Sequence, residues 1–276
     1  MSILLQISDP HFGTEQPPVV AALLDLARQL KPEVIALSGD ITQRARRGQF
    51  AAAADFVAQL PPSRLLAIPG NHDIPMFNLA ARAFTPYANF QRVFGADLEP
   101  LHDSENMLVI GVNTTRPQRR KDGEVSKEQI ESVAARLRTA RPQQLRIVMI
   151  HQPVHVIRTQ DLENVLHGHR IAVPAWAAAG ADLIMGGHIH LPYVRPLEEH
   201  FADLPRRVWA VQAGTAVSSR VRHEAPNSVN VVRHKAAQAA CEVERWDFHA
   251  PSREFRCVEM QALELDRLRT ITRRDA

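Results

Sequence analysis

Five short apolar runs, each followed at once by polar residues and glycine or proline, constrain the fold of this chain most. They are ILLQISDPH at 3–11, VIALSGD at 34–40, LLAIPGNHD at 65–73, RIVMIHQP at 146–153 and ADLIMGGHIH at 181–190. Their apolar residues are continuous rather than alternating, which is typical of strands buried on both faces. The sequence therefore predicts a sheet packed between two other layers.

Helical patterns lie between these runs. Apolar residues recur at helical spacing over 20–30, with prolines on both sides, and again over 50–60 before Pro61. A third helix is predicted to begin at Ser126, where SKEQ forms a capping box. This strand and helix order predicts an α/β fold with parallel pairing and right-handed crossovers.

The pattern of apolar and turn residues changes toward the C-terminus. Residues 206–260 contain strand-like segments separated by turn residues, which predicts an antiparallel second sheet with a β-bulge near Glu244. An Arg-rich tail follows at 261–276. With no internal repeat and no low-complexity linker, residues 1–276 are interpreted as one domain with two sheets.

Residues 74–96 interrupt the pattern and carry five of the twelve Phe and Tyr residues of the chain. Tyr87, Phe90 and Phe94 have helical spacing, which favours packing over base stacking. The segment directly follows the GNHD motif, so it could also form a cap segment that walls an active site.

Composition narrows the class of protein. No apolar run approaches the length of a membrane span and the N-terminus lacks a secretion signal, so a cytoplasmic protein without a membrane partner is expected. Cys241 and Cys257 are interpreted as reduced core thiols. The net charge of +3 suits phosphorylated substrates. The basic run RPQRRK at 116–121 is interpreted as a solvated loop, and nucleic acid is disfavoured as a partner.

Each of the five apolar runs ends in residues that can bind a metal or transfer a proton. Taken alone, each has an ordinary structural explanation as a helix cap, a turn former or a partly buried histidine. Strand ends converge at one edge of an α/β sheet, however, and so many ionisable groups buried together call for a cation. The mixture of imidazole, carboxylate and amide suits zinc, manganese or iron. The residues are Asp9, His11, Asp40, Asn71, His72, His151, His188 and His190.

In order and spacing these residues resemble the calcineurin-like metallophosphoesterases, whose pattern is DxH, GD, GNH followed by D or E, a lone H and GHxH. The resemblance implies a four-layer αββα sandwich with two mixed sheets flanked by helices. It also implies two metal ions (Mn, Fe or Zn): Asp9, His11 and His190 would bind one, Asn71, His151 and His188 the other, and Asp40 would bridge them. His72 would face the substrate and protonate or stabilise the leaving oxygen.

The stretches LSGDITQRARRGQF at 37–50 and AGTAVSSRVRHEAPNSVNVV at 213–232 resemble the bacterial class III cyclic nucleotide phosphodiesterase branch. The resemblance implies hydrolysis of a small phosphodiester, such as a cyclic nucleotide, by a metal-bridging hydroxide. Alternatives are a phosphomonoesterase, a nuclease of the same fold, or an interaction scaffold. His223 is a further histidine that could reach the site, and edge strands of 206–260 could pair in a homodimer.

Overall fold

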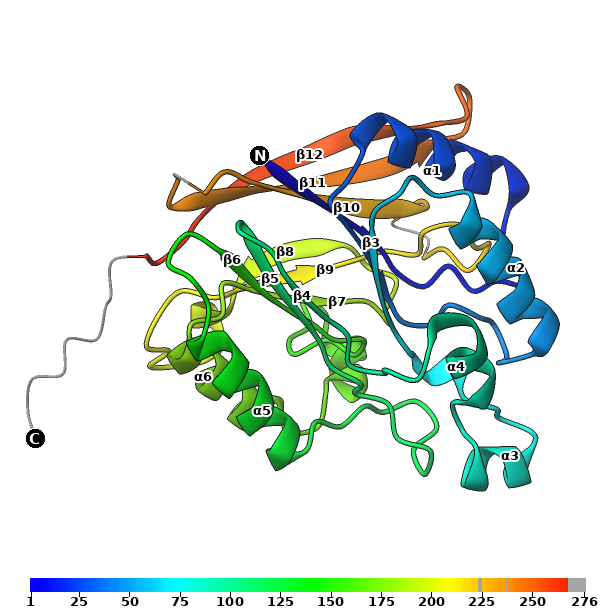
Figure 1. Ribbon diagram of the computed structural model, residues 1–276, viewed down its shortest axis with the longest axis horizontal. Coiled ribbons are helices and arrows are strands. Elements are labelled where there is room, and N and C mark those ends of the chain that lie inside the picture. Colours follow the sequence, from blue (N-terminus) through cyan, green and yellow to red (C-terminus); the bar gives the residue numbers. More distant parts are fainter. Residues whose placement is uncertain (223–224, 237, 268–276) are drawn as a thin grey trace, which may run out of the picture.

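Two six-stranded sheets lie face to face, with helices outside both (Figure 1). The computed structural model describes residues 1–222, 225–236 and 238–267. The first sheet has the order β12-β11-β10-β1-β2-β3 and the second β4-β5-β6-β7-β9-β8, and each contains parallel and antiparallel pairs. The predicted αββα sandwich with two mixed sheets is confirmed.

The strand bounds show that all five apolar runs become strands, four of them interior and the third, β3, at the edge of the first sheet. The first sheet consists of β1 (Ser2–Ile7), β2 (Val34–Ser38), β3 (Arg64–Ile68), β10 (Ser228–His234), β11 (Ala240–His249) and β12 (Glu254–Glu264). The second consists of β4 (Leu101–Asp103), β5 (Met107–Gly111), β6 (Leu145–Met149), β7 (Leu183–Gly186), β8 (Tyr193–Pro196) and β9 (Trp209–Gln212). Strand β5 shares the format of the five runs and was missed by sequence analysis.

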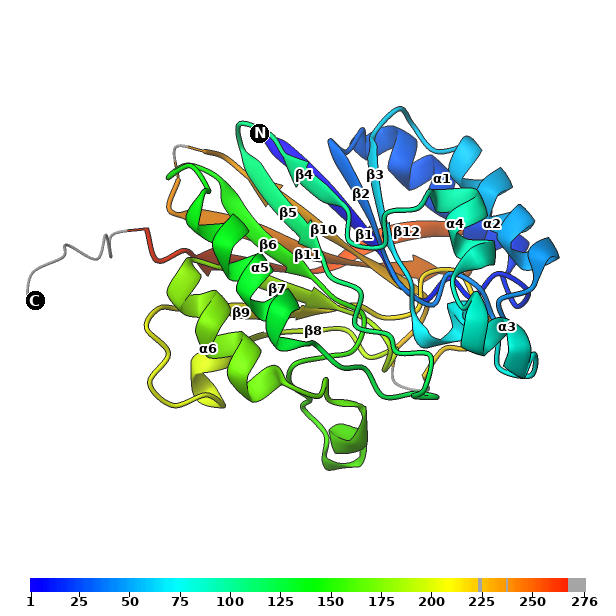
Figure 2. The same cartoon turned by 60° about the horizontal axis from the view of Figure 1, so that its bottom comes forward.

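Helices cover the outer faces of both sheets (Figure 1, Figure 2). Helices α1 (Pro17–Leu30) and α2 (Arg47–Ala58) pack on the first sheet, and α5 (Lys127–Arg138) and α6 (His169–Ala179) pack on the second. Helix α4 (Ala88–Phe94) packs against α2, and α3 (Leu79–Phe84) lies at one end of the sandwich (Figure 2). The predicted capping box of α5 is present, because Ser126 Oγ accepts from the Gln129 backbone N–H at 3.2 Å and Gln129 Oε1 accepts from the Ser126 N–H at 3.0 Å. Sequence analysis missed α6, which contains Pro174.

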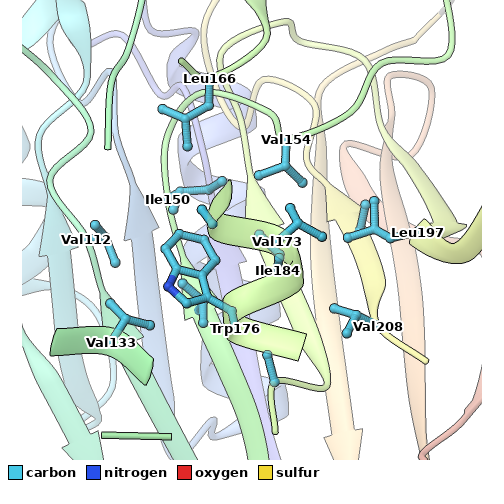
Figure 3. Packing of buried hydrophobic residues seen from close by; sticks show 14 of the residues in the cluster. Val112, Val133, Ile150, Val154, Leu166, Val173, Trp176, Ile184, Leu197 and Val208 are labelled. Atoms are coloured by element: carbon cyan, nitrogen blue, oxygen red, sulfur yellow. The ribbon is translucent and has the colours of Figure 1, made fainter. Parts of the chain in front are cut away.

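Three apolar cores hold the four layers together. In β1, Leu4 belongs to the core between the sheets and Leu5 to the core under α1 and α2, so this strand is buried on both faces as predicted. The third core lies between the second sheet and α5 and α6. Figure 3 shows its centre, where the Trp176 indole lies among aliphatic residues of the sheet and helices.

The strands after residue 206 do not form a sheet of their own, so the prediction of second-sheet strands at 206–260 is wrong. Strand β9 inserts between β7 and β8 of the second sheet, whereas β10, β11 and β12 extend the first sheet. The reason is burial: Val231 and Val232 of β10 both have no exposed area, so this strand needs a layer on each face and pairs with β1. The pattern of residues identified strands but not their partners.

Other C-terminal expectations have mixed outcomes. The predicted bulge is present as a register shift between Arg245 and Trp246. The predicted tail at 261–276 begins inside β12, and residues 268–276 lie outside the described part of the chain. Cys241 is buried as expected, but Cys257 is exposed and is not a core thiol. Among the described residues, no helix combines the length and apolar character needed to cross a bilayer.

Candidate metal centre

The polar residues that follow the apolar runs meet at one end of the sandwich, where the loops after the strands gather near α3 and α4 (Figure 2). Asp9 and His11 follow β1, Asp40 follows β2 and Asn71 follows β3. The second sheet supplies the remaining three, which are His151 after β6 and then His188 and His190 after β7. The site therefore lies across the junction of the two sheets.

A first cluster joins Asp9, His11 and His190, whose ligand atoms all lie within 4.8 Å of one another. His190 Nε2 lies 3.2 Å from Asp9 Oδ1 and 3.1 Å from His11 Nε2. The other Asp9 oxygen, Oδ2, accepts from the His188 backbone N–H at 2.9 Å and from Ser8 Oγ at 2.5 Å. These bonds fix the carboxylate so that Oδ1 faces the two imidazoles.

A second cluster joins Asp40, His151 and His188 within the same limit. Asp40 Oδ1 lies 3.3 Å from His151 Nε2, and Asp40 Oδ2 lies 3.7 Å from His11 Nε2 of the first cluster. One carboxylate therefore has an oxygen on each cluster. This arrangement is what a ligand shared by two metals requires.

The buried atoms that face these clusters have no hydrogen-bond partners among the described residues. They are Asp9 Oδ1, Asn71 Oδ1, His151 Nε2 and both nitrogens of His188. Buried polar atoms are nearly always paired, so five unpaired atoms in one place indicate a site for cations. The Nδ1 atoms of His151 and His190 do have partners. His151 Nδ1 bonds to Ser38 O at 2.8 Å, and His190 Nδ1 bonds to Arg220 O at 2.6 Å.

That outer bonding fixes the tautomers. His190 Nδ1 faces a carbonyl oxygen and must carry the hydrogen, so a neutral His190 presents the lone pair of Nε2 to the site. This nitrogen lies 3.1 Å from His11 Nε2, so the two rings present their Nε2 atoms to the same place. The donor set of nitrogens and oxygens therefore fits two ions of the manganese, iron or zinc type.

Burial and the two carboxylates set the protonation of the imidazoles. Burial lowers the pKa of His11 and His188 to about 3, which leaves both neutral and ready to bind metal. At His151 burial also lowers the pKa, but Asp40 and Asp9 outweigh it and raise the pKa to about 9. Burial would raise the pKa of Asp40, yet His151 and His72 hold it well below its usual range.

The backbone at these positions is left-handed, which sequence analysis did not foresee. Positive φ angles are found at Asp9 (51°), His11 (44°), Asp40 (49°), His188 (72°) and His190 (55°). Such angles are uncommon outside glycine and concentrate at functional sites. The turn sends His188 to one cluster and His190 to the other.

The sequence model of the calcineurin-like phosphoesterases matches residues 3–192, more than half of the chain. The chain belongs to the calcineurin-like phosphoesterase family. A probable cyclic nucleotide phosphodiesterase of Synechococcus sp. is 22% identical over 203 residues, which are 70% of this chain and 74% of that protein.

Solved structures agree on the fold of this calcineurin-like phosphoesterase. A dimetal phosphatase from Danio rerio has a TM-score of 0.64 at 12% identity, with 95% of this chain and 98% of that chain covered. A purple acid phosphatase from yellow lupin seeds has a TM-score of 0.69 at 14% identity and covers 96% of this chain. This chain spans only about half (54%) of the lupin enzyme.

In this family member, Asp73 ties two of the motif loops together, a role that the sequence did not reveal. Its carboxylate accepts from the backbone N–H groups of Ile41 (3.0 Å), Thr42 (2.7 Å) and Gly70 (2.9 Å). The GNHD motif therefore holds the loop that carries Asp40.

The backbone of Gly187 lies close to the loop after β1. A Cβ atom at this position would come within 1.9 Å of Ser8 Oγ and 2.4 Å of Asp9 Oδ2, so only glycine fits here.

A cavity of about 410 Å³ opens beside the two clusters and is lined by Asp40, Asn71, His72, His188 and His190 among others. The basic run at 116–121, expected to be only a solvated loop, contributes Arg120 and Lys121 to the wall. The 74–96 segment contributes Met76 to the wall, consistent with the expected wall.

Phe90 of the 74–96 segment is buried, as the prediction of packing at this position required. His223 lies outside the described residues, but Arg220 of the same loop reaches the cavity.

Proposed function

We propose that this protein is a phosphodiesterase that uses two metal ions to cleave a small phosphodiester such as a cyclic nucleotide. The observation that carries the proposal is the pair of clusters that share Asp40 at the wall of one cavity. The cavity has the size of a small-molecule site. The preference for a diester is supported by the name of the Synechococcus relative and by the two phosphodiesterase-like stretches.

The proposed role of each ligand follows from its position in the two clusters. Asp9, His11 and His190 would hold one ion, His151 and His188 the other, and Asp40 would serve both. Asn71, whose buried Oδ1 has no partner among the described residues, would join the second ion as the family resemblance implies. A bound pair of cations activates water as a nucleophile and offsets charge on the attacking and leaving oxygens. The protein fixes the ligand atoms in place through the outer bonds of Asp9, His151 and His190.

His72 is proposed to act on the leaving oxygen. It lines the cavity beside the clusters, with Nε2 4.0 Å from Asp40 Oδ2. Its Nδ1 lies 2.8 Å from the backbone oxygen of Gln43, so Nδ1 carries a hydrogen and Nε2 is left for the substrate side. The Asp40 carboxylate also accepts from the His72 backbone N–H at 2.7 Å, which fixes His72 relative to the clusters.

The test of the function is hydrolysis of bis(p-nitrophenyl) phosphate and p-nitrophenyl phosphate by metal-stripped protein before and after addition of manganese. We expect no cleavage without metal and faster cleavage of the diester with it, because the site needs cations to bind a phosphoryl group. Preference for the monoester would instead establish a phosphatase. Protein that binds two manganese ions yet cleaves neither ester would point to an interaction scaffold.

Metal binding is expected to release protons and to weaken as the pH falls. In the metal-free protein the raised pKa of His151, about 9, keeps this ligand protonated at neutral pH, so a metal must displace its proton. Each pH unit below about 9 should then weaken manganese binding at that site by about tenfold. Titration calorimetry in two buffers of different ionisation enthalpy measures the proton count. An affinity that does not change between about pH 6 and 8 would contradict the protonation of His151.

A further inference from the structure

Arg220 lies in the loop that connects β9 to β10 and is anchored to the site through its backbone. Its N–H donates to Ser218 Oγ at 3.1 Å, and its carbonyl oxygen accepts from His190 Nδ1 at 2.6 Å. The neighbouring Ser219 N–H donates to Thr14 O at 2.9 Å. The backbone of Arg220 is therefore held in one position relative to the first cluster.

The Arg220 guanidinium points into the cavity toward His72. Its Nη1 donates to Gln43 Oε1 at 3.1 Å and lies 3.3 Å from His72 Nε2. That nitrogen accepts from Nη1 when it carries no hydrogen, and a proton held there for the leaving oxygen replaces this contact. Nη1 also lies 3.4 Å from His11 Nδ1. If His11 binds a metal through Nε2, its Nδ1 carries a hydrogen and repels Nη1. One of the three contacts of Nη1 is therefore lost when the site is loaded.

The positive charge of Arg220 has no carboxylate partner within ion-pair distance among the described residues. None of its partners is a carboxylate, and its Nε and Nη2 make no hydrogen bond within the described part of the chain. The nearby Arg222 is different, because it binds Asp161 with both oxygens at 3.0 and 3.1 Å and also Ile189 O. A partly buried guanidinium with unused donors in a cavity is suited to an oxyanion.

We propose that Arg220 binds a non-bridging oxygen of the scissile phosphoryl group, beside the leaving-group position of His72. The proposal rests on the proposed function and adds an oxyanion subsite made by the protein itself. Arg220 would then contribute to the affinity for the phosphoryl group independently of the metal ligands. Inorganic phosphate has the same non-bridging oxygens, so it should bind there as well.

The experiment compares the manganese-loaded wild type with Arg220→Gln, Arg220→Lys and the control Arg119→Gln. Arg119 belongs to the basic run at 116–121 but is not among the residues that line the cavity, and it pairs with Glu124 at 2.7 Å, so its substitution removes equal charge without touching His72. Binding of inorganic phosphate is measured by calorimetry. The values of kcat and KM are measured with bis(p-nitrophenyl) phosphate, and the metal content is measured by mass spectrometry.

We expect Arg220→Gln to weaken phosphate binding about tenfold and to lower kcat/KM about 10- to 100-fold with manganese content unchanged. Arg220→Lys should recover part of both, and Arg119→Gln should change neither by more than about threefold. Values for Arg220→Gln that match those of the control overturn the proposal. Loss of manganese in Arg220→Gln also overturns it and assigns the residue to holding His190. If the wild type cleaves neither ester, the proposed function fails, and phosphate binding alone still decides the role of Arg220.

Discussion

Replacing Asp40 with asparagine is expected to lower the metal content and to reduce kcat/KM by about 1,000-fold or more. The substitution keeps the shape but removes the negative charge shared by the two clusters, where Asp40 lies 3.3 Å from His151 Nε2 and 3.7 Å from His11 Nε2. Removing one partner of a buried charge set costs about 3–5 kcal/mol. The carboxylate that offsets the burial of the imidazoles would be lost as well.

The measurement is metal content by mass spectrometry together with diester hydrolysis at saturating manganese. Asp161→Asn is the matched control, because Asp161 is buried at the same cavity but pairs with Arg222 instead of facing a cluster. It should keep both metals. An Asp40→Asn protein that retains two manganese ions and wild-type activity would rule out the shared-ligand role.

Replacing His72 with glutamine is expected to lower kcat by about 100-fold or more for a diester with an alkyl leaving group, with both metals retained. The loss should be much smaller for bis(p-nitrophenyl) phosphate, because p-nitrophenolate departs without needing a proton. His72 lines the cavity and belongs to neither metal cluster. Its substitution should therefore affect the leaving group more than metal binding.

The comparison uses 3′,5′-cyclic AMP and bis(p-nitrophenyl) phosphate with each protein. His167→Gln serves as the control, since His167 also lies in an HxH-like stretch, HGH, but is half-exposed and 3.7 Å from Asp122, away from the clusters. Equal losses on both esters would show that His72 positions the substrate or Asp40 and does not assist the departing oxygen.

Much of the site could be predicted because it depends on local patterns. Apolar runs identified five of the strands that lead to the site, and polar residues at the ends of parallel strands converge in an α/β sheet. Asp9, Asp40 and His151 could therefore be grouped from the sequence. The resemblance then implied how His188 and His190 divide between the metals, and the two clusters have that division.

What could not be predicted depends on contacts between distant residues. Arg220 is 148 positions from His72. The sequence pointed to His223 of the same loop, but nothing in the residue pattern distinguished Arg220 from the other arginines. The partners of β10 and β11 depend on which faces become buried, which a strand pattern does not encode. The left-handed turns at Asp9 and His188 arise from the packing of several loops and have no glycine signal at those residues.

The position of β1 in the first sheet has a consequence for synthesis of the protein on the ribosome. Strand β1 lies between β2 and β10, and Ser2 pairs with His234. At about 5–20 residues per second, roughly 12–46 s pass between translation of β1 and of β10. Throughout this time the nascent chain carries an apolar strand with one open edge. This edge of β1 therefore stays open on the nascent chain until β10 has been translated and has left the exit tunnel.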